Sequence, residues 1–215
     1  TYKGKDDLII YETPYPENVI VGEKIIKPEI ITGIPKASMD RETIGIVLGN
    51  TKFWDPTIVG KSSTNENVKQ VREYFRGLFG MDDHAIIPSQ YWFFNEGISS
   101  KDFKAVFDAD IGFIRKKIES SLDYSEKSLL DLMLYYSGEG TTYKGDKVLI
   151  PYDADTTKGH TFFPVKDLYA SLAALQAIPE VGEVTLFMDV DFNNAAFAQN
   201  IVKQSDIQED SKKKK

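Results

Sequence analysis

Acidic side chains stand at the ends of two apolar runs that are typical of buried strands. Glu139 follows the run 129–136 within the sequence Ser-Gly-Glu-Gly, and Asp189 and Asp191 close the run 184–190. In open α/β sheets, ligands and catalytic groups gather at the carboxyl ends of the strands. Carboxylates at such a place can hold Mg²⁺ or Ca²⁺ through oxygen, or share a proton as an acid–base pair.

Two further acids, Asp153 and Asp155, follow the shorter apolar run 147–151. If they converge with the first group, the chain could be a cation-binding protein or a hydrolase that uses its acidic loops. The alternative is that each acid is separately solvated or hydrogen-bonded. We predict no metal ligands and no cofactor.

The residue types that are missing exclude several chemistries. The chain has no cysteine, which rules out disulfides, thiolate-held metals and a cysteine nucleophile. It has only two histidines, His84 and His160, and both fall in polar turns where we expect them at the surface. Chemistry that needs several histidines is therefore excluded.

The overall charge argues against nucleic acid as a partner. The 215 residues carry a formal net charge of −7, and four of the 26 basic residues are the lysines 212–215, so the rest is more acidic still. A phosphate backbone requires a basic face. No apolar run is long enough to span a membrane or to act as a signal peptide, so we expect an intracellular, cytoplasmic protein without membrane contact.

The elements that must position these acids alternate between strands and helices, which predicts an α/β fold with a mostly parallel sheet and helices on both faces. Apolar runs predict strands, and apolar residues at helical spacing predict helices. The expected strands are 44–49, 85–88, 129–136, 147–151 and 184–190, and the expected helices are 68–79, 99–122 and 165–178.

The periodic pattern divides the chain into three parts. Residues 1–42 carry short β-branched runs interrupted by prolines, which favours an extended N-terminal arm or edge strands. Residues 43–202 form the expected α/β domain, and residues 203–215 form a charged, flexible tail. The aromatic block 91–94 is either a buried strand or a contact patch for another protein.

Two segments carry a resemblance to the caspase-like peptidases, the clan of caspases, metacaspases and paracaspases. LMLYYSGEG resembles the strand and Tyr-Ser-Gly-His-Gly loop of the catalytic histidine, with Glu139 at the histidine position. TLFMDVDFNN resembles the strand and loop of the cysteine nucleophile, with Asp191 at that position. Asp191 follows Glu139 by 52 residues, close to the ~50-residue spacing of caspases.

Other landmarks occur in the same order as in that clan, and together they cover about residues 43–198. KVLIPYDAD resembles the segment after the histidine loop, FPVKDLYASLAAL the helix that follows, and IGIVLGN the first strand. The resemblance implies a three-layer α/β/α sandwich with a mostly parallel sheet.

The replacements at the two catalytic positions imply a pseudoenzyme. In the family a cysteine thiolate attacks the scissile carbonyl and a histidine handles the proton. Asp191 is a poor nucleophile toward an amide, and Glu139 is an acid that is normally ionised at neutral pH. We therefore expect an inactive, metacaspase-like homologue that acts as a binding, scaffolding or regulatory subunit.

Asp189 sits two residues before the nucleophile position. The resemblance implies that, with Ser137 and Gly138, it could line a pocket for a basic peptide side chain. The alternative is an aspartate that caps a nearby backbone amide.

The family's small-subunit strands have no counterpart after Asp191, so the chain looks like the large-subunit half alone. The strand 184–190 would then lie at a sheet edge with unpaired backbone groups. The edge is covered by a protein partner, such as a small-subunit-like chain that could complete a peptidase, or by the N-terminal arm, or the chain is truncated.

Overall fold

In the computed structural model, which describes residues 42–61, 63–88, 97–122 and 129–192, the chain adopts an α/β fold. Its strands are β1 (Glu42–Gly49), β2 (Ile86–Ile87), β3 (Leu130–Tyr143), β4 (Asp146–Leu149), β5 (Phe163–Pro164) and β6 (Val181–Asp191). Its helices are α1 (Thr64–Gly77), α2 (Ser100–Phe107), α3 (Phe113–Leu122) and α4 (Val165–Gln176), with short 3₁₀ turns η1 (Asp83–Ala85) and η2 (Gly159–Thr161). The N-terminal arm, the aromatic block 91–94 and the tail 203–215 lie outside the described residues.

The sheet has a parallel part and an antiparallel part that share β3. Strands β2, β1, β3 and β6 lie side by side in that order and run parallel. The far end of β3 pairs antiparallel with β4, which in turn pairs with β5. The predicted mostly parallel sheet is therefore confirmed in coarse form, with an antiparallel extension that the sequence pattern did not distinguish.

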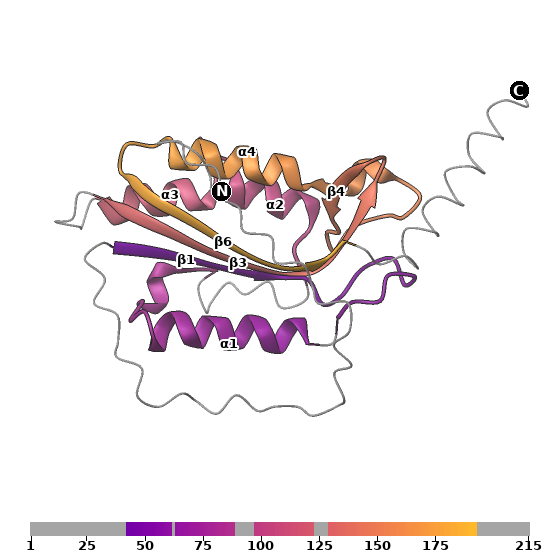
Figure 1. Cartoon of the computed structure of the whole chain (residues 1–215), viewed down its shortest axis with the longest axis horizontal. Coiled ribbons are helices and arrows are strands. Elements are labelled where there is room, and N and C mark those ends of the chain that lie inside the picture. The colour runs from indigo at the N-terminus through magenta and orange to yellow at the C-terminus, as the bar shows by residue number, and fades with distance from the viewer. Residues whose placement is uncertain (1–41, 62, 89–96, 123–128, 193–215) are drawn as a thin grey trace, which may run out of the picture.

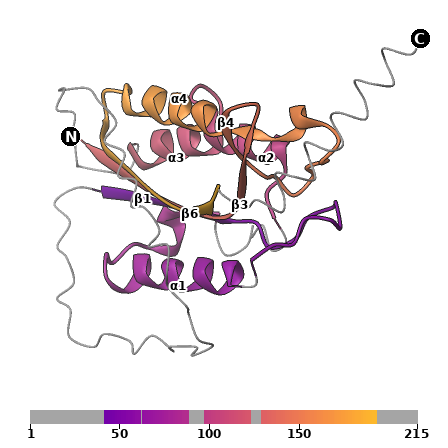
Figure 2. The ribbon, with the colours of Figure 1, turned by 45° about the vertical axis from the view of Figure 1, so that its right-hand side comes forward.

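Helices cover both faces of the sheet (Figures 1 and 2). Helix α1 lies on one face, and α2, α3 and α4 lie on the other. The main core fills the space between the sheet and the latter three helices, where the Phe103 ring stacks on Phe163 with 4.7 Å between centroids. A smaller core between α1 and the sheet includes Val47, Val68 and Phe75. Among the described residues, no helix has the length and apolarity needed to cross a membrane.

The prediction of one helix over 99–122 is wrong, because two helices occupy that segment. The side chain of Asp108 accepts hydrogen bonds from the backbone N–H groups of Asp110 and Ile111, which form a turn that competes with helix continuation. Ile111 is consequently 71% exposed instead of lying on the apolar face of a helix.

The strand predicted over 129–136 continues to Tyr143, so residues 137–140 belong to the strand and not to a loop. A two-residue turn with positive φ at Lys144 (52°) and Gly145 (88°) folds β4 back against this extension. Turns of that conformation match the twist of a β-hairpin. The added partner strand supplies backbone hydrogen bonds that keep residues 140–143 extended.

Candidate functional site

The two acidic segments lie next to each other at the carboxyl end of the parallel sheet. In the register of β3 and β6, Ser137 is opposite Asp189 and Glu139 is opposite Asp191. Strand β1 leads into α1 on one face, whereas the chain after β3 leads to α4 on the other face (Figure 1). The connections that follow β1 and β3 therefore leave toward opposite faces of the sheet, and open α/β sheets bind ligands where neighbouring connections part in this way.

Glu139 is a buried carboxylate, only 6% exposed, and its Oε1 accepts a hydrogen bond of 3.0 Å from the backbone N–H of Lys61. Burial raises the pKa of Glu139, the charge and N–H of Lys61 lower it, and the carboxylates of Asp191 and Asp189 raise it. The net result is a pKa above the ordinary value for glutamate. Asp191 itself is exposed at the end of β6.

Asp189 is at the centre of a side-chain network. Its Oδ2 accepts hydrogen bonds from Ser137 Oγ at 2.9 Å and from Asn67 Nδ2 at 3.2 Å. Its Oδ1 lies 3.4 Å from Lys61 Nζ, and the two side chains are 23% and 27% exposed. The ammonium of Lys61 thus lies where a basic ligand of Asp189 would have to bind.

Two glycines near the site leave room for side chains that pack closely against them. A Cβ added to Gly49, at the end of β1, would lie 2.5 Å from Val68 Cγ2 on α1. A Cβ added to Gly138 would lie 2.6 Å from the hydroxyl of Tyr136. Contacts this short do not occur between real atoms, so Gly49 allows α1 to approach β1, and Gly138 leaves room for the Tyr136 side chain of its own strand. Among the residues predicted for a peptide pocket, Gly138 therefore serves packing, and Ser137 and Asp189 contact each other.

Asn50, the residue after β1, ties three loops together beneath the site. Its side chain is fully buried, and its Oδ1 accepts a hydrogen bond from the Ile98 N–H. Its Nδ2 donates to the carbonyls of Ile150 at 3.0 Å and Ile98 at 3.3 Å, and to the Tyr136 hydroxyl at 3.4 Å. The backbone N–H of Asn50 donates to the Ser137 carbonyl at 3.0 Å. This amide therefore joins the ends of β1 and β4 to the segment before α2.

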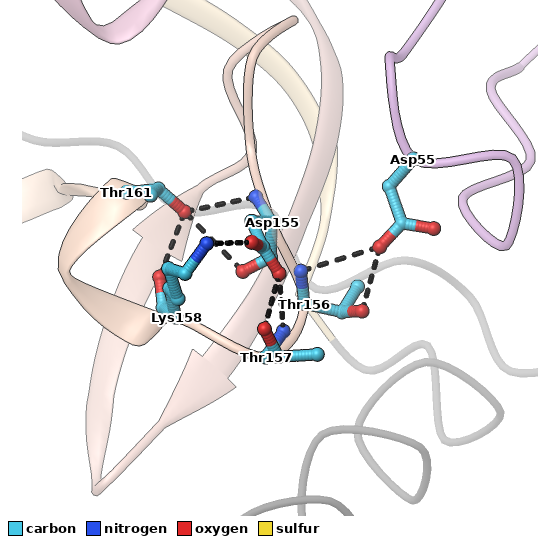
Figure 3. Close-up of polar contacts among 6 residues, drawn as sticks. All are labelled: Asp55, Asp155, Thr156, Thr157, Lys158 and Thr161. Atoms are coloured by element: carbon cyan, nitrogen blue, oxygen red, sulfur yellow. Dashed lines mark hydrogen bonds and ion pairs between the residues drawn. The ribbon is translucent and has the colours of Figure 1, made fainter.

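The loop between β1 and α1 is held against the loop after β4 (Figure 3). Asp55 accepts a hydrogen bond of 2.6 Å from the hydroxyl of Thr156, which Figure 3 shows, and another of 2.6 Å from the hydroxyl of Thr57. Burial alone would raise the pKa of Asp55, but the hydrogen bonds from Thr156 and Thr57 outweigh it and hold the pKa below its usual range. Ile58 anchors the same loop in a small apolar cluster with Ile150. The loop that carries Lys61 is therefore fixed at several points.

The other predicted acids do not join Glu139. Asp153 accepts hydrogen bonds from the backbone N–H and hydroxyl of Ser100, at the start of α2. Asp155 is bound by Thr157 and Lys158 within its own turn (Figure 3), and these hydrogen bonds lower its pKa to about 2. In the part of the chain that the structure describes, no three acidic or histidine side chains form a group that could hold a metal ion.

The histidines take no part in this site. His84 and His160 are both exposed, as the sequence predicted. His84 lies in η1, the turn before β2, at the opposite end of the parallel strands from Glu139.

Sequence reasoning missed three residues of the site. Lys61 and Asn67 belong to no pattern that the sequence displays, and only the structure brings both side chains to Asp189. Asn50 did carry a signal, because a single amide that ends a doubly buried strand must satisfy its hydrogen bonds inside the protein.

No protein-family model matches this chain, and no curated protein matches its sequence. Its function therefore has to be inferred from the geometry of these residues.

Proposed function

We propose that this chain is a catalytically inactive caspase-like domain that serves as a binding, scaffolding or regulatory subunit of a larger protein assembly. One observation carries the proposal. Glu139 and Asp191, which stand at the histidine and cysteine positions of the resemblance, are direct register partners at the carboxyl ends of adjacent parallel strands. A nucleophile and its base would need to be neighbours of this kind.

The chemistry of the two side chains argues against peptide hydrolysis. An aspartate that added to an amide carbonyl would leave again more readily than the amine, because its carboxylate is the more stable anion. The buried oxygen of Glu139 already accepts the Lys61 N–H, so it is held in place as a structural acceptor. The chain contains no cysteine to replace the missing nucleophile.

Turnover assays test the absence of activity. We expect the pure protein to hydrolyse no fluorogenic peptide with lysine, arginine or aspartate before the scissile bond, and the Asp191→Ala variant to behave identically. Hydrolysis by the native chain that disappears in Asp191→Ala would refute the proposal. Hydrolysis that survives in Asp191→Ala would point to a contaminating peptidase, and a second purification tag would then separate the two sources.

A second candidate function is favoured by the network around Asp189. Its carboxylate is partly exposed and already pairs with the ammonium of Lys61, so a lysine or arginine side chain of a peptide could take the place of Lys61. We expect the Lys61→Met variant to bind arginine-containing peptides more tightly than the native chain does. Equal binding by both proteins would exclude a pocket of this kind.

The hydrolase or cation-binding alternative depends on the same acids. The carboxylates of Asp191 and Asp189 raise the pKa of Glu139, which would favour a proton held by Glu139, whereas a bound cation would require these acids to draw closer together than they are in the described residues. Calorimetric titration with Ca²⁺, Mg²⁺ and Mn²⁺ separates this alternative from a scaffold, since only a cation-binding protein would release or absorb heat that Asp191→Ala abolishes.

A further inference from the structure

Strand β6 presents an open sheet edge. Within the described residues it pairs with β3 and with no other strand, although its register with β3 extends from Val181 to Asp191. Natural sheets protect such edges with lysines, prolines or short strands. Strand β6 has 11 residues and includes neither lysine nor proline, and the irregularity in its register with β3 falls near its start, between Val181 and Val184, so these devices do not protect residues 184–191.

Of the helices that the structure describes, none packs over one face of β6. Helix α4 packs on one side of the strand, whereas α1, alone on the opposite side, packs on β1 and β3 (Figures 1 and 2). Asp189 reaches Asn67 of α1, so it points to the α1 side, and Phe187 points the same way because side chains alternate along a strand. Phe187 is 50% exposed and lies opposite the half-buried Tyr135 of β3.

The charged side chains that β6 itself places on this face are all acidic, and Lys61, from the loop before α1, pairs with one of them, Asp189. Glu183, Asp189 and Asp191 alternate along the strand on the same side as Phe187, and β6 contains no lysine or arginine. A second copy of this chain is a poor occupant. Two β6 strands paired antiparallel about Phe187 would place Asp191 of one copy opposite Glu183 of the other, and no register of the two strands creates an opposite-charge pair.

We propose that β6 is a docking edge for an extended segment of another protein chain in which lysine or arginine alternates with apolar residues. Such a segment would add as a strand, pair its backbone with β6, place an apolar side chain against Phe187 and set its basic side chains beside the flanking carboxylates. This inference deepens the proposed function and rests on it, because it names the kind of partner that the subunit would bind.

Fluorescence anisotropy with synthetic peptides tests the docking edge. The probe is a labelled peptide of about eight residues, a common strand length, in which lysine alternates with valine. The matched control peptide carries glutamate in place of each lysine. We expect the basic peptide to bind, to bind at least tenfold more tightly than the acidic one, and to lose affinity as salt is added.

Two protein variants locate the binding. Phe187→Lys removes the apolar contact and places a positive charge on the edge, which repels the lysines of the basic peptide. It should weaken the binding of that peptide about tenfold or more. Ile111→Lys makes the same change at an exposed isoleucine between α2 and α3 and should leave the affinity unchanged. Hydrogen exchange with bound peptide should slow at the amides of residues 184–190.

Several results would overturn the docking edge. These are equal binding of both peptides, full affinity in Phe187→Lys, protection of amides elsewhere, or no binding at all. A concentration-dependent dimer that Phe187→Lys abolishes would instead identify a second copy as the occupant and would also refute the proposal. None of these results would restore hydrolysis, so a failure of the docking edge is distinguishable from a failure of the inactive-domain proposal.

Discussion

Replacing Asn50 tests how the site is held together. In Asn50→Ala the Ile98 N–H loses its acceptor and the Ile150 carbonyl loses its side-chain donor, while the Ile98 carbonyl keeps a hydrogen bond of 2.8 Å from the Tyr152 N–H. Two buried backbone groups are thus left without a partner. Each such group costs about 1–3 kcal/mol, so we expect a loss of about 4 kcal/mol in the free energy of unfolding.

This loss is large against the total stability of a domain, which is typically about 5–15 kcal/mol. For a domain of this size it corresponds to a decrease in Tm on the order of 10 °C. The measurement is urea unfolding followed by circular dichroism, with a thermal melt of the same samples. Asn65→Ala, at an exposed position of α1, is the matched control and should change the stability by less than about 0.5 kcal/mol.

Asn50→Asp sharpens the test, because it keeps the acceptor and shape of the side chain. It replaces the donor with a second oxygen that would face the Ile150 and Ile98 carbonyls, so we expect it to be at least as destabilising as alanine above the pKa of the new acid. An Asn50→Ala variant that loses less than about 1 kcal/mol, with an unchanged dependence on urea, would refute the role assigned to this amide.

Three further predictions concern Glu139 and two residues near it. Gly49→Ala should lower the stability by about 1–3 kcal/mol in thermal melts, because its Cβ would lie 2.5 Å from Val68 Cγ2, and a neutral result would mean that α1 can shift freely. Burial raises the pKa of Glu139, so the folded state binds the proton of this carboxyl more tightly than the unfolded state does. The contribution of Glu139 to stability therefore falls as the pH rises from the ordinary pKa of 4.5 through the raised pKa of the folded state. Glu139→Gln should therefore gain stability relative to the native chain at neutral pH compared with about pH 4, and the opposite trend in urea titrations would contradict the burial argument. Lys61→Met should lower the free energy of unfolding by less than about 1 kcal/mol, because the ion pair with Asp189 is partly solvated. The same variant should raise the pKa of Glu139 further in an NMR titration, because the charge of Lys61 lowers that pKa. A lowered pKa would show that Lys61 does not act on that carboxylate.

The sequence predicted the parallel core well, because its strands are continuous apolar runs that must be buried on both faces. The run around Ile46 became β1 and the run around Leu134 became β3, in the parallel arrangement that alternating strands and helices require. The proximity of Glu139 and Asp191 was also foreseeable, because each comes at or just after the end of an apolar run and the two runs form adjacent parallel strands. These inferences depend on local patterns that the sequence displays directly.

The parts that could not be foreseen depend on competition between local and distant contacts. The Asp108 side chain ends α2 by bonding to the backbone, and no apolar periodicity reports such a turn. The extension of β3 past Ser137 depends on β4 folding back upon it. The placement of Lys61 beside Asp189 results from a long polar loop that is held by Asp55 and Thr156, a contact between residues 101 positions apart.

The central proposal is that Glu139 and Asp191 occupy the positions of a lost histidine and cysteine pair. It can be tested by putting these two residues back. Because the native chain has no cysteine, Asp191→Cys creates a single thiol whose alkylation rate by iodoacetamide can be followed against pH. With the Glu139 carboxylate as its neighbour, we expect this thiol to titrate above the ordinary value of about 8.5. In the double variant Asp191→Cys and Glu139→His, an imidazolium beside the thiol should lower its pKa below that value. The same pKa in both variants would show that the two positions do not face each other as a dyad and would contradict the caspase-like proposal.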